Sequence, residues 1–174
     1  MKFLSDNLWR RITALAKKNS RRSLVAVAYF GSGASELLPL RKDSVLVVDM
    51  SPRAVESGQT DPNEIIKLLE KGVEIHSVEN LHAKVFVLGS RAIIGSANAS
   101  RHSAKRLIEA ALEVADERIV AACREFIWDQ TGEHITLQYA KKMVPLYTPP
   151  RFGTGRRTAP KHAPLWAVSL VERS

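Results

Sequence analysis

The chain has 174 residues, of which 45% are hydrophobic and 25% charged, and this is the size and composition of one globular domain with its own core. Its single cysteine, Cys123, excludes an intrachain disulfide and a cysteine-rich zinc site. The net charge of +8 lies at the two ends: residues 1–35 carry seven basic residues and one acidic residue, and residues 134–171 carry six basic residues and no acidic one.

The first half of the chain alternates helices with buried strands. Apolar residues at helical spacing predict an amphipathic helix over residues 5–18, and unbroken apolar runs predict strands over 24–30 and 44–50. A short helix is expected over 34–40, after a glycine-containing loop. Another helix begins at Asp61-Pro62 and ends at Gly72.

The second half begins with strands. Three are expected, over residues 73–79, 81–88 and 91–97, and the turn Gly89-Ser90-Arg91 joins the last two as a hairpin. Residues 107–116 alternate apolar and acidic side chains, which predicts a half-buried strand with its apolar side inward. Further elements are expected as a short turn over 100–105, helices over 117–130 and 135–144, and a strand over 163–174.

This order of elements predicts an α/β sandwich, a mixed sheet with helices on both faces. Residues 1–147 are expected to form the domain. Residues 148–174 begin with a proline-rich, glycine-containing basic stretch, which predicts an arm or the start of a further segment. The chain could equally be the catalytic half of a larger protein.

The residues that carry chemistry lie in the predicted hairpin. His82 and Lys84 are two apart on a strand, so their side chains point to the same face. The next strand ends in Gly95-Ser96-Ala97-Asn98, and hairpin pairing brings this end back beside His82. Gly95 permits close backbone approach, and Ser96 and Asn98 offer neutral hydrogen bonds. Together these groups predict a phosphate site that contains a nucleophile.

This pattern resembles the HKD motif of the phospholipase D superfamily, H-x-K-x4-D followed by G-S/G-x-N. His82, Lys84, Gly95, Ser96 and Asn98 match it, over a resemblance that covers about residues 20–130, whereas Gly89 stands where the family has aspartate. Glu109 matches the acid that holds the catalytic histidine ring in members with a single motif. The resemblance implies the phospholipase D/nuclease fold with one motif per chain.

The resemblance also implies a mechanism. A family active site needs two motifs, so two copies of this chain would form a homodimer with one site across the two-fold interface. His82 of one copy attacks phosphorus to give a phosphohistidine, and His82 of the other protonates the leaving oxygen. Lys84, Asn98 and Ser96 stabilise the phosphate, and Glu109 fixes the imidazole tautomer. No metal or other cofactor is needed.

Other interpretations of these residues stay open. Glu109 could be an exposed acid at a strand edge, in which case Glu113 could be the acid that holds the histidine ring. Asn98 could be a turn residue. His76 and His82 could be metal ligands. The loop Gly31-Ser32-Gly33 could bind an anion where it opens a helix.

The favoured substrate is nucleic acid, DNA before RNA, because the basic ends suit a polyanion. The candidate backbone contacts are Lys141, Lys142, Arg151, Arg156, Arg157 and Lys161. The alternatives are a hydrolase or transferase acting on phospholipid or another small phosphodiester, and a non-catalytic nucleic-acid-binding module. With no apolar run near ~20 residues and no signal peptide, we expect no stable membrane insertion and a cytoplasmic location.

Overall fold

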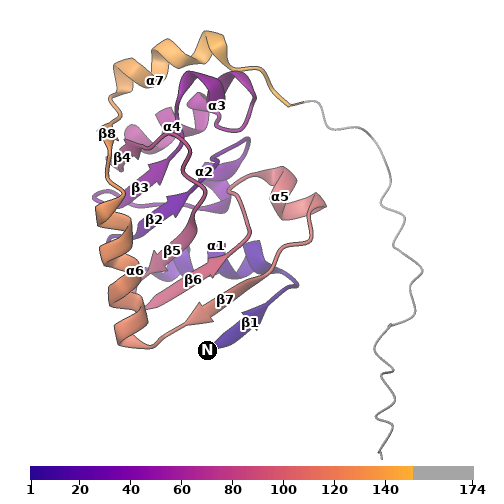
Figure 1. The fold of residues 1–174 in the computed structure, drawn as a ribbon, viewed down its shortest axis with the longest axis vertical. Coiled ribbons are helices and arrows are strands. Elements are labelled where there is room, and N and C mark those ends of the chain that lie inside the picture. The colour runs from indigo at the N-terminus through magenta and orange to yellow at the C-terminus, as the bar shows by residue number, and fades with distance from the viewer. Residues whose placement is uncertain (151–174) are drawn as a thin grey trace, which may run out of the picture.

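The computed structural model describes residues 1–150, in which eight strands form one mixed sheet (Figure 1). The strands lie in the order β1-β7-β6-β5-β2-β3-β4-β8. Their bounds are β1 Lys2–Leu4, β2 Leu24–Val27, β3 Val45–Val48, β4 Glu74–Ser77, β5 Lys84–Leu88, β6 Arg91–Gly95, β7 Ala111–Val114 and β8 Glu133–His134. The helices are α1 Leu8–Lys18, α2 Ala34–Leu37, α3 Pro52–Glu56, α4 Pro62–Leu69, α5 Arg101–Arg106, α6 Glu117–Asp129, α7 Leu137–Met143 and the 3-10 helix η1 Val144–Leu146.

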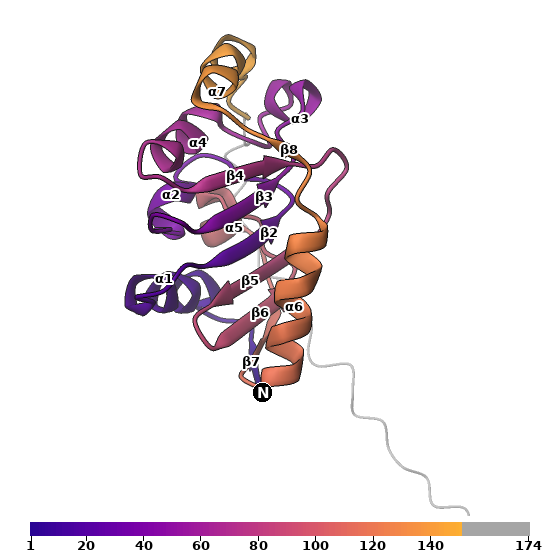
Figure 2. The same ribbon diagram turned by 90° about the vertical axis from the view of Figure 1, so that its left-hand side faces the viewer.

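The sheet is covered on both faces, which explains why β2 and β3 are apolar at every position. Seen along the sheet, α1, α2 and α4 lie on one face and α6 lies on the other (Figure 2). Successive residues of β2 alternate between two cores: Val25 packs on the α1 side and Ala26 on the α6 side. An unbroken apolar strand is stable because neither of its faces meets water. The predicted α/β class, a mixed sheet between helices, is confirmed.

Strand direction brings the motif-bearing segments to one edge of the sheet. Strands β2, β3 and β4 are parallel. Strand β6 runs the same way, because it is antiparallel to β5 and β5 is antiparallel to β2. The carboxyl ends of these four strands therefore meet at one edge, together with the amino ends of β5 and β7. We call this the carboxyl edge; open α/β sheets commonly bind ligands there.

The predicted helices and strands within residues 1–150 are present, and four short elements, β1, α3, β8 and η1, are added. The predicted helix over 5–18 begins at Leu8, and Leu4 belongs instead to β1, which pairs with β7. Strand β8 and helix α3 are also additions. Elements of two to five residues are too short for hydrophobic periodicity to reveal.

The division of the chain at residue 147 stays a prediction. Helix α7 and η1 lead to residues 148–150, which are the only part of the expected arm among the described residues. The expected strand over 163–174 lies outside the described residues.

The orientation predicted for the strand over 107–116 is wrong. In β7, Glu113 is 2% exposed and Leu112 is 40% exposed, the reverse of the expected faces, whereas Val114 is buried as expected. Arg11 of α1 explains the reversal, because its guanidinium donates to both oxygens of Glu113, at 2.6 and 2.7 Å. Arg91 of β6 adds a third bond at 2.9 Å. Alternation identifies two faces of a strand but not which of them a helix will cover.

The Glu113 carboxylate makes stability depend on pH. Its hydrogen bonds from Arg11 outweigh its burial and lower the pKa of Glu113 below the ordinary 4.5. A lowered native pKa adds stability above pH 4.5, and this stability is lost as the pH falls through the native value. We expect Glu113→Gln to lower the free energy of unfolding by about 1–3 kcal/mol at pH 7. The difference from wild type should shrink below pH 4.5 in urea denaturation.

Glu125→Gln is the matched control, because Glu125 is an exposed carboxylate on the outer side of α6. It should leave the free energy of unfolding near that of wild type both at pH 7 and below pH 4.5. A Glu113→Gln variant as stable as Glu125→Gln at pH 7 would show that the ion pair contributes nothing.

Candidate active site

The structure brings the five predicted site residues to the carboxyl edge. His82 immediately precedes β5 and Lys84 begins it, whereas Ser96 and Asn98 follow the end of β6. Glu109 lies just before β7. All five therefore lie at or next to strand ends that meet at one edge of the sheet, as the predicted hairpin requires.

A crossing of the chain places Asn98 beside the His82 segment. Beyond β2 the chain bends at Ala28, which donates to the carbonyl of Ala83 at 2.9 Å. In the next residues Ala99 donates to the carbonyl of Tyr29 at 3.1 Å, and Phe30 forms a parallel bridge with Ala99. The chain leaving β6 thus passes over the start of β5 to reach β2. This crossing sets Asn98 over the strand that begins with Lys84.

Lys84 is a buried cation at the site. It is 7% exposed, and its Nζ donates to the carbonyl oxygen of His82 at 3.0 Å. Burial lowers the pKa of Lys84, and the nearby Glu109 carboxylate opposes that shift. A further anion near the ammonium would oppose it more. Negative charge near this ammonium thus stabilises its protonated form.

Glu109 is held by two serine hydroxyls. It is 8% exposed, which contradicts the interpretation of an exposed strand-edge acid. Its carboxylate accepts hydrogen bonds from Ser96 Oγ and, at 2.8 Å, from Ser103 Oγ. Ser103 in turn accepts from Trp9 Nε1 at 3.3 Å. Glu113 does not take the place of Glu109, because Arg11 and its neighbours engage it on the α1 side of β7.

Two side chains at the site keep free polar atoms. His82 is exposed, and its imidazole makes no hydrogen bond to any of residues 1–150. Asn98 Oδ1 is the only buried side-chain oxygen or nitrogen within the described part of the chain that has no partner. A buried acceptor without a partner costs free energy until a donor reaches it. These atoms are therefore placed to meet a ligand or a second protein chain.

Two adjoining hollows open at the carboxyl edge. One has a volume of about 720 Å³ and is lined by Asn98, by α5 and by the segment around Tyr147. The other, of about 380 Å³, is lined by His82 together with residues that follow β3 and β4. Tyr29, Ser57 and Gln59 line both hollows. His82 and Asn98 thus line two neighbouring hollows that share three lining residues.

The glycines of the motif have separate structural tasks. A Cβ on Gly95 would lie 2.5 Å from the Cβ of Ala111, so only glycine lets β6 lie this close to β7. Gly89, at the position where the family has aspartate, is the first residue of the β5–β6 turn with φ of +68°. That turn is about 20 Å from His82 by the rise of a strand. The departure from the family pattern therefore lies at the opposite edge.

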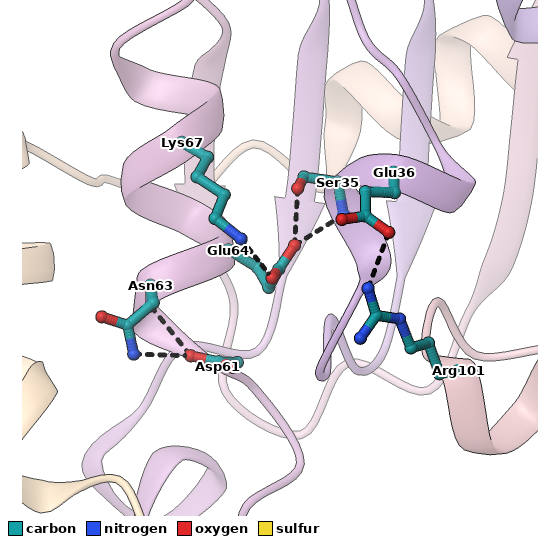
Figure 3. Close-up of polar contacts among 7 residues, drawn as sticks. All are labelled: Ser35, Glu36, Asp61, Asn63, Glu64, Lys67 and Arg101. Carbon is teal, nitrogen blue, oxygen red and sulfur yellow. Dashed lines mark hydrogen bonds and ion pairs between the residues drawn. The ribbon is translucent and has the colours of Figure 1, made fainter.

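The Gly31–Gly33 loop supports α5 at the rim of the larger hollow. Gly33 has φ of +75°, and a Cβ there would overlap the side chain of Arg101, which pairs with Glu36 at 2.7 Å (Figure 3). The helix that this loop opens, α2, is a single turn. In the structure the loop makes room for the side chain of Arg101.

Glu64 secures α2 from the other side. Its buried carboxylate accepts from Ser35 N at 2.9 Å, from Ser35 Oγ at 2.5 Å and from Lys67 Nζ at 2.7 Å (Figure 3). Burial alone would raise the pKa of Glu64, but these hydrogen bonds outweigh it and lower the pKa. The Glu64 carboxylate thereby joins α2 to α4.

The remaining candidates that fall within residues 1–150 are not part of this site. Lys141 and Lys142 are exposed in the last turn of α7 and line neither hollow. Arg151, Arg156, Arg157 and Lys161 lie outside the described residues. His76 is bonded to Glu74 and to the carbonyl of Gly132, and within residues 1–150 no group of three or more His, Cys, Asp or Glu side chains could hold a metal ion.

Sequence reasoning missed four site residues of two kinds. The basic residues Arg101, Lys105 and Arg106 line the larger hollow, and their clustering just after Asn98 is visible in the sequence. The cluster is hidden when charge is summed over residues 36–133, which carry twelve basic and sixteen acidic residues. Ser103 gave no signal, because its partner Trp9 is 94 residues away.

Comparison with known proteins identifies the fold. In solved structures, Nuc from Salmonella typhimurium, a phospholipase D family member, matches with a TM-score of 0.60 at 14% identity, and NucT from Helicobacter pylori with 0.59 at 12%. Each match covers 77% of this chain and 96% of the other. TrmBL2, an archaeal chromatin protein with a novel mode of DNA binding, matches with a TM-score of 0.52 at 11% identity, over 77% of this chain and 53% of that protein.

The described helices include none that is both long and apolar enough to cross a membrane. No curated protein matches the sequence. The family model described as "Cardiolipin synthase, PLD-like domain" matches residues 6–130. This match spans most of the chain and contains every motif residue described above, so the chain belongs to the phospholipase D superfamily, as a PLD-like domain.

Proposed function

We propose that this protein is a metal-independent phosphodiesterase that hydrolyses nucleic acid, with DNA as the preferred substrate. The observation that carries the proposal is that His82, Lys84 and Asn98 all lie at strand ends on the carboxyl edge of a PLD-like domain, with Lys84 Nζ bonded to the carbonyl of His82. A free imidazole supplies a nucleophile, and a buried ammonium and an amide NH2 group supply donors for phosphate oxygens.

The reaction has two steps. A ring nitrogen of neutral His82 attacks phosphorus, the bond from phosphorus to the leaving oxygen breaks, and the imidazolium of a second His82 gives its proton to that oxygen. Water then attacks the phosphohistidine while the second imidazole takes a proton from it, and the phosphorus–nitrogen bond breaks. Lys84 neutralises charge on the non-bridging oxygens in both steps, and the Asn98 amide NH2 donates hydrogen bonds to them. Ser96 gives its one hydroxyl hydrogen to Glu109, so it holds that carboxylate and does not donate to the phosphate.

The second histidine comes from another copy of the chain. The sequence holds one H-x-K motif, and one imidazole cannot act on both sides of a phosphorus atom at once. Leu107 and Ile108, beside Glu109, are exposed, Ile108 by 80%, and such apolar residues suit a protein–protein contact. A carboxylate has about four lone-pair sites, so Glu109 can keep both serine bonds and accept one from the partner's imidazole.

The preference for nucleic acid rests on charge. The chain carries a net charge of +8, and Arg101, Lys105 and Arg106 line the hollow that contains Asn98. DNA is placed before RNA because TrmBL2, which matches this fold, is a chromatin protein that binds DNA.

Two further functions have specific support. The family model names a cardiolipin synthase, which favours action on phospholipid. The chromatin protein among the matched structures favours a module that binds DNA without cutting it. A cleavage assay with both kinds of substrate separates these two functions from the nuclease.

The first experiment measures cleavage of labelled single- and double-stranded DNA and RNA in excess EDTA. We expect wild type to cut, His82→Asn to lose at least about 1,000-fold in rate, and Lys84→Met about 100-fold. His134→Asn is the matched control, because His134 is an exposed histidine on β8, at the far side of the sheet. It should cut like wild type.

Absence of cutting in EDTA, or equal cutting by His82→Asn, overturns the nuclease proposal. Headgroup release from anionic phospholipid vesicles without DNA cleavage would assign the lipid function. Salt-dependent DNA binding without turnover on either substrate would assign the binding module.

The second experiment tests whether the active site is shared. Wild-type and His82→Asn proteins are mixed in equal amounts at constant total concentration and left to exchange subunits. If both histidines of a dimer are required, about one quarter of the wild-type activity should remain, against about one half for independent monomers.

Sedimentation gives the mass in parallel. Ile108→Arg should dissociate the dimer and lower activity together with mass. An active monomer, or activity that falls in proportion to the wild-type fraction, contradicts the shared site.

A further inference from the structure

The hollow beside α5 has the chemistry of a nucleotide site. We propose that it binds an unpaired nucleotide next to the scissile phosphate, so that the enzyme acts on single strands; this rests on the proposed function. In Figure 1, α5 stands beyond the carboxyl edge, below the segment that follows α7. The hollow lies between this helix and that segment and includes Asn98 in its lining.

The inner lining suits a flat apolar ring. Tyr29 and Tyr147 contribute aromatic rings, and Pro149 and Leu107 contribute further apolar surface. Burial and the neighbouring Asp61 raise the pKa of Tyr147 to about 12, so its ring stays neutral. Nucleobases stack on such rings with little sequence preference. In a duplex the base faces are already stacked, so only an unpaired base can use this surface.

The rim suits phosphate. Arg101, Lys105 and Arg106 project from α5, which follows directly after Asn98 along the chain. Among the described residues that line the hollow, the one acidic residue is Asp61, which is 8% exposed. Its carboxylate is engaged by Asn63 and by the hydroxyl of Tyr147, so its charge is partly compensated. A strand can therefore place its backbone along α5 and one base in the hollow.

A lipid chain fits this lining less well. Polar groups of Gln59 and Ser32 line the hollow among the apolar residues. An acyl chain would leave these groups without hydrogen bonds, which is costly. The edges of a nucleobase carry donors and acceptors that can pair with them.

The test measures binding by the inactive His82→Asn protein to a fluorescent single-stranded oligonucleotide and to the same sequence as a duplex. We expect tighter binding of the single strand. Adding Tyr147→Ala should weaken single-strand binding about tenfold, whereas Tyr147→Phe, which keeps the ring, should not. Adding Lys105→Glu and Arg106→Glu together should weaken binding about tenfold and flatten its salt dependence.

Lys71→Glu is the charge control, because Lys71 is exposed between α4 and β4, near the opposite edge of the sheet. It should bind like the His82→Asn parent. Thermal melts of all variants show whether they fold. If Tyr147→Ala unfolds, the outcome is decided by comparing the affinity of the Lys105→Glu, Arg106→Glu variant with that of Lys71→Glu. Phospholipid vesicles that compete with the oligonucleotide for the hollow would assign it to lipid instead.

The inference and the proposed function can fail separately. Cleavage by wild type together with unchanged affinity in the folded Tyr147 and α5 variants overturns the nucleotide site and leaves the nuclease. Lost affinity in those variants together with an inactive wild type keeps the site and overturns the nuclease. Equal binding of duplex and single strand, unaffected by Tyr147→Ala, also overturns the nucleotide site.

Discussion

A buried ammonium and a buried carboxylate lie close together at the carboxyl edge of the sheet. Removing either charge from water is expensive unless the other charge and several hydrogen bonds compensate. Lys84 uses the carbonyl of His82, and Glu109 uses Ser96 and Ser103. These bonds hold the residues just before β5 and tie together the segment between β6 and β7.

This compensation leaves the functional atoms ready for a ligand. Because Lys84 and Glu109 are bonded to the protein, the function that we propose requires neither to be reordered when a phosphate binds. His82 and Asn98 are different, since the imidazole is exposed and the Asn98 oxygen is buried without a partner. The structure thus separates groups that are bonded within the protein from groups whose polar atoms are free.

The elements that surround the site also explain its surface. Arg101 fits over Gly33 and pairs with Glu36, and Glu64 joins the same short helix to α4. Helix α5 is therefore fixed at the rim, with its basic side chains next to Asn98. A rigid basic helix beside a shallow apolar hollow favours a ligand with a charged backbone and flat apolar rings.

The sequence by itself determined the α/β class, the hairpin and the convergence of His82, Lys84 and Asn98. Strand periodicity, hairpin pairing and the motif spacing are local properties, and local properties can be followed along the chain. Only the tertiary structure decided that Glu109 is buried and that Glu113 faces Arg11. It alone brought Ser103 to Trp9 and Tyr147 to α5. The burial and the contacts of these residues depend on which helix covers which face of the sheet. Residues that are distant in sequence determine this covering through packing and charge compensation.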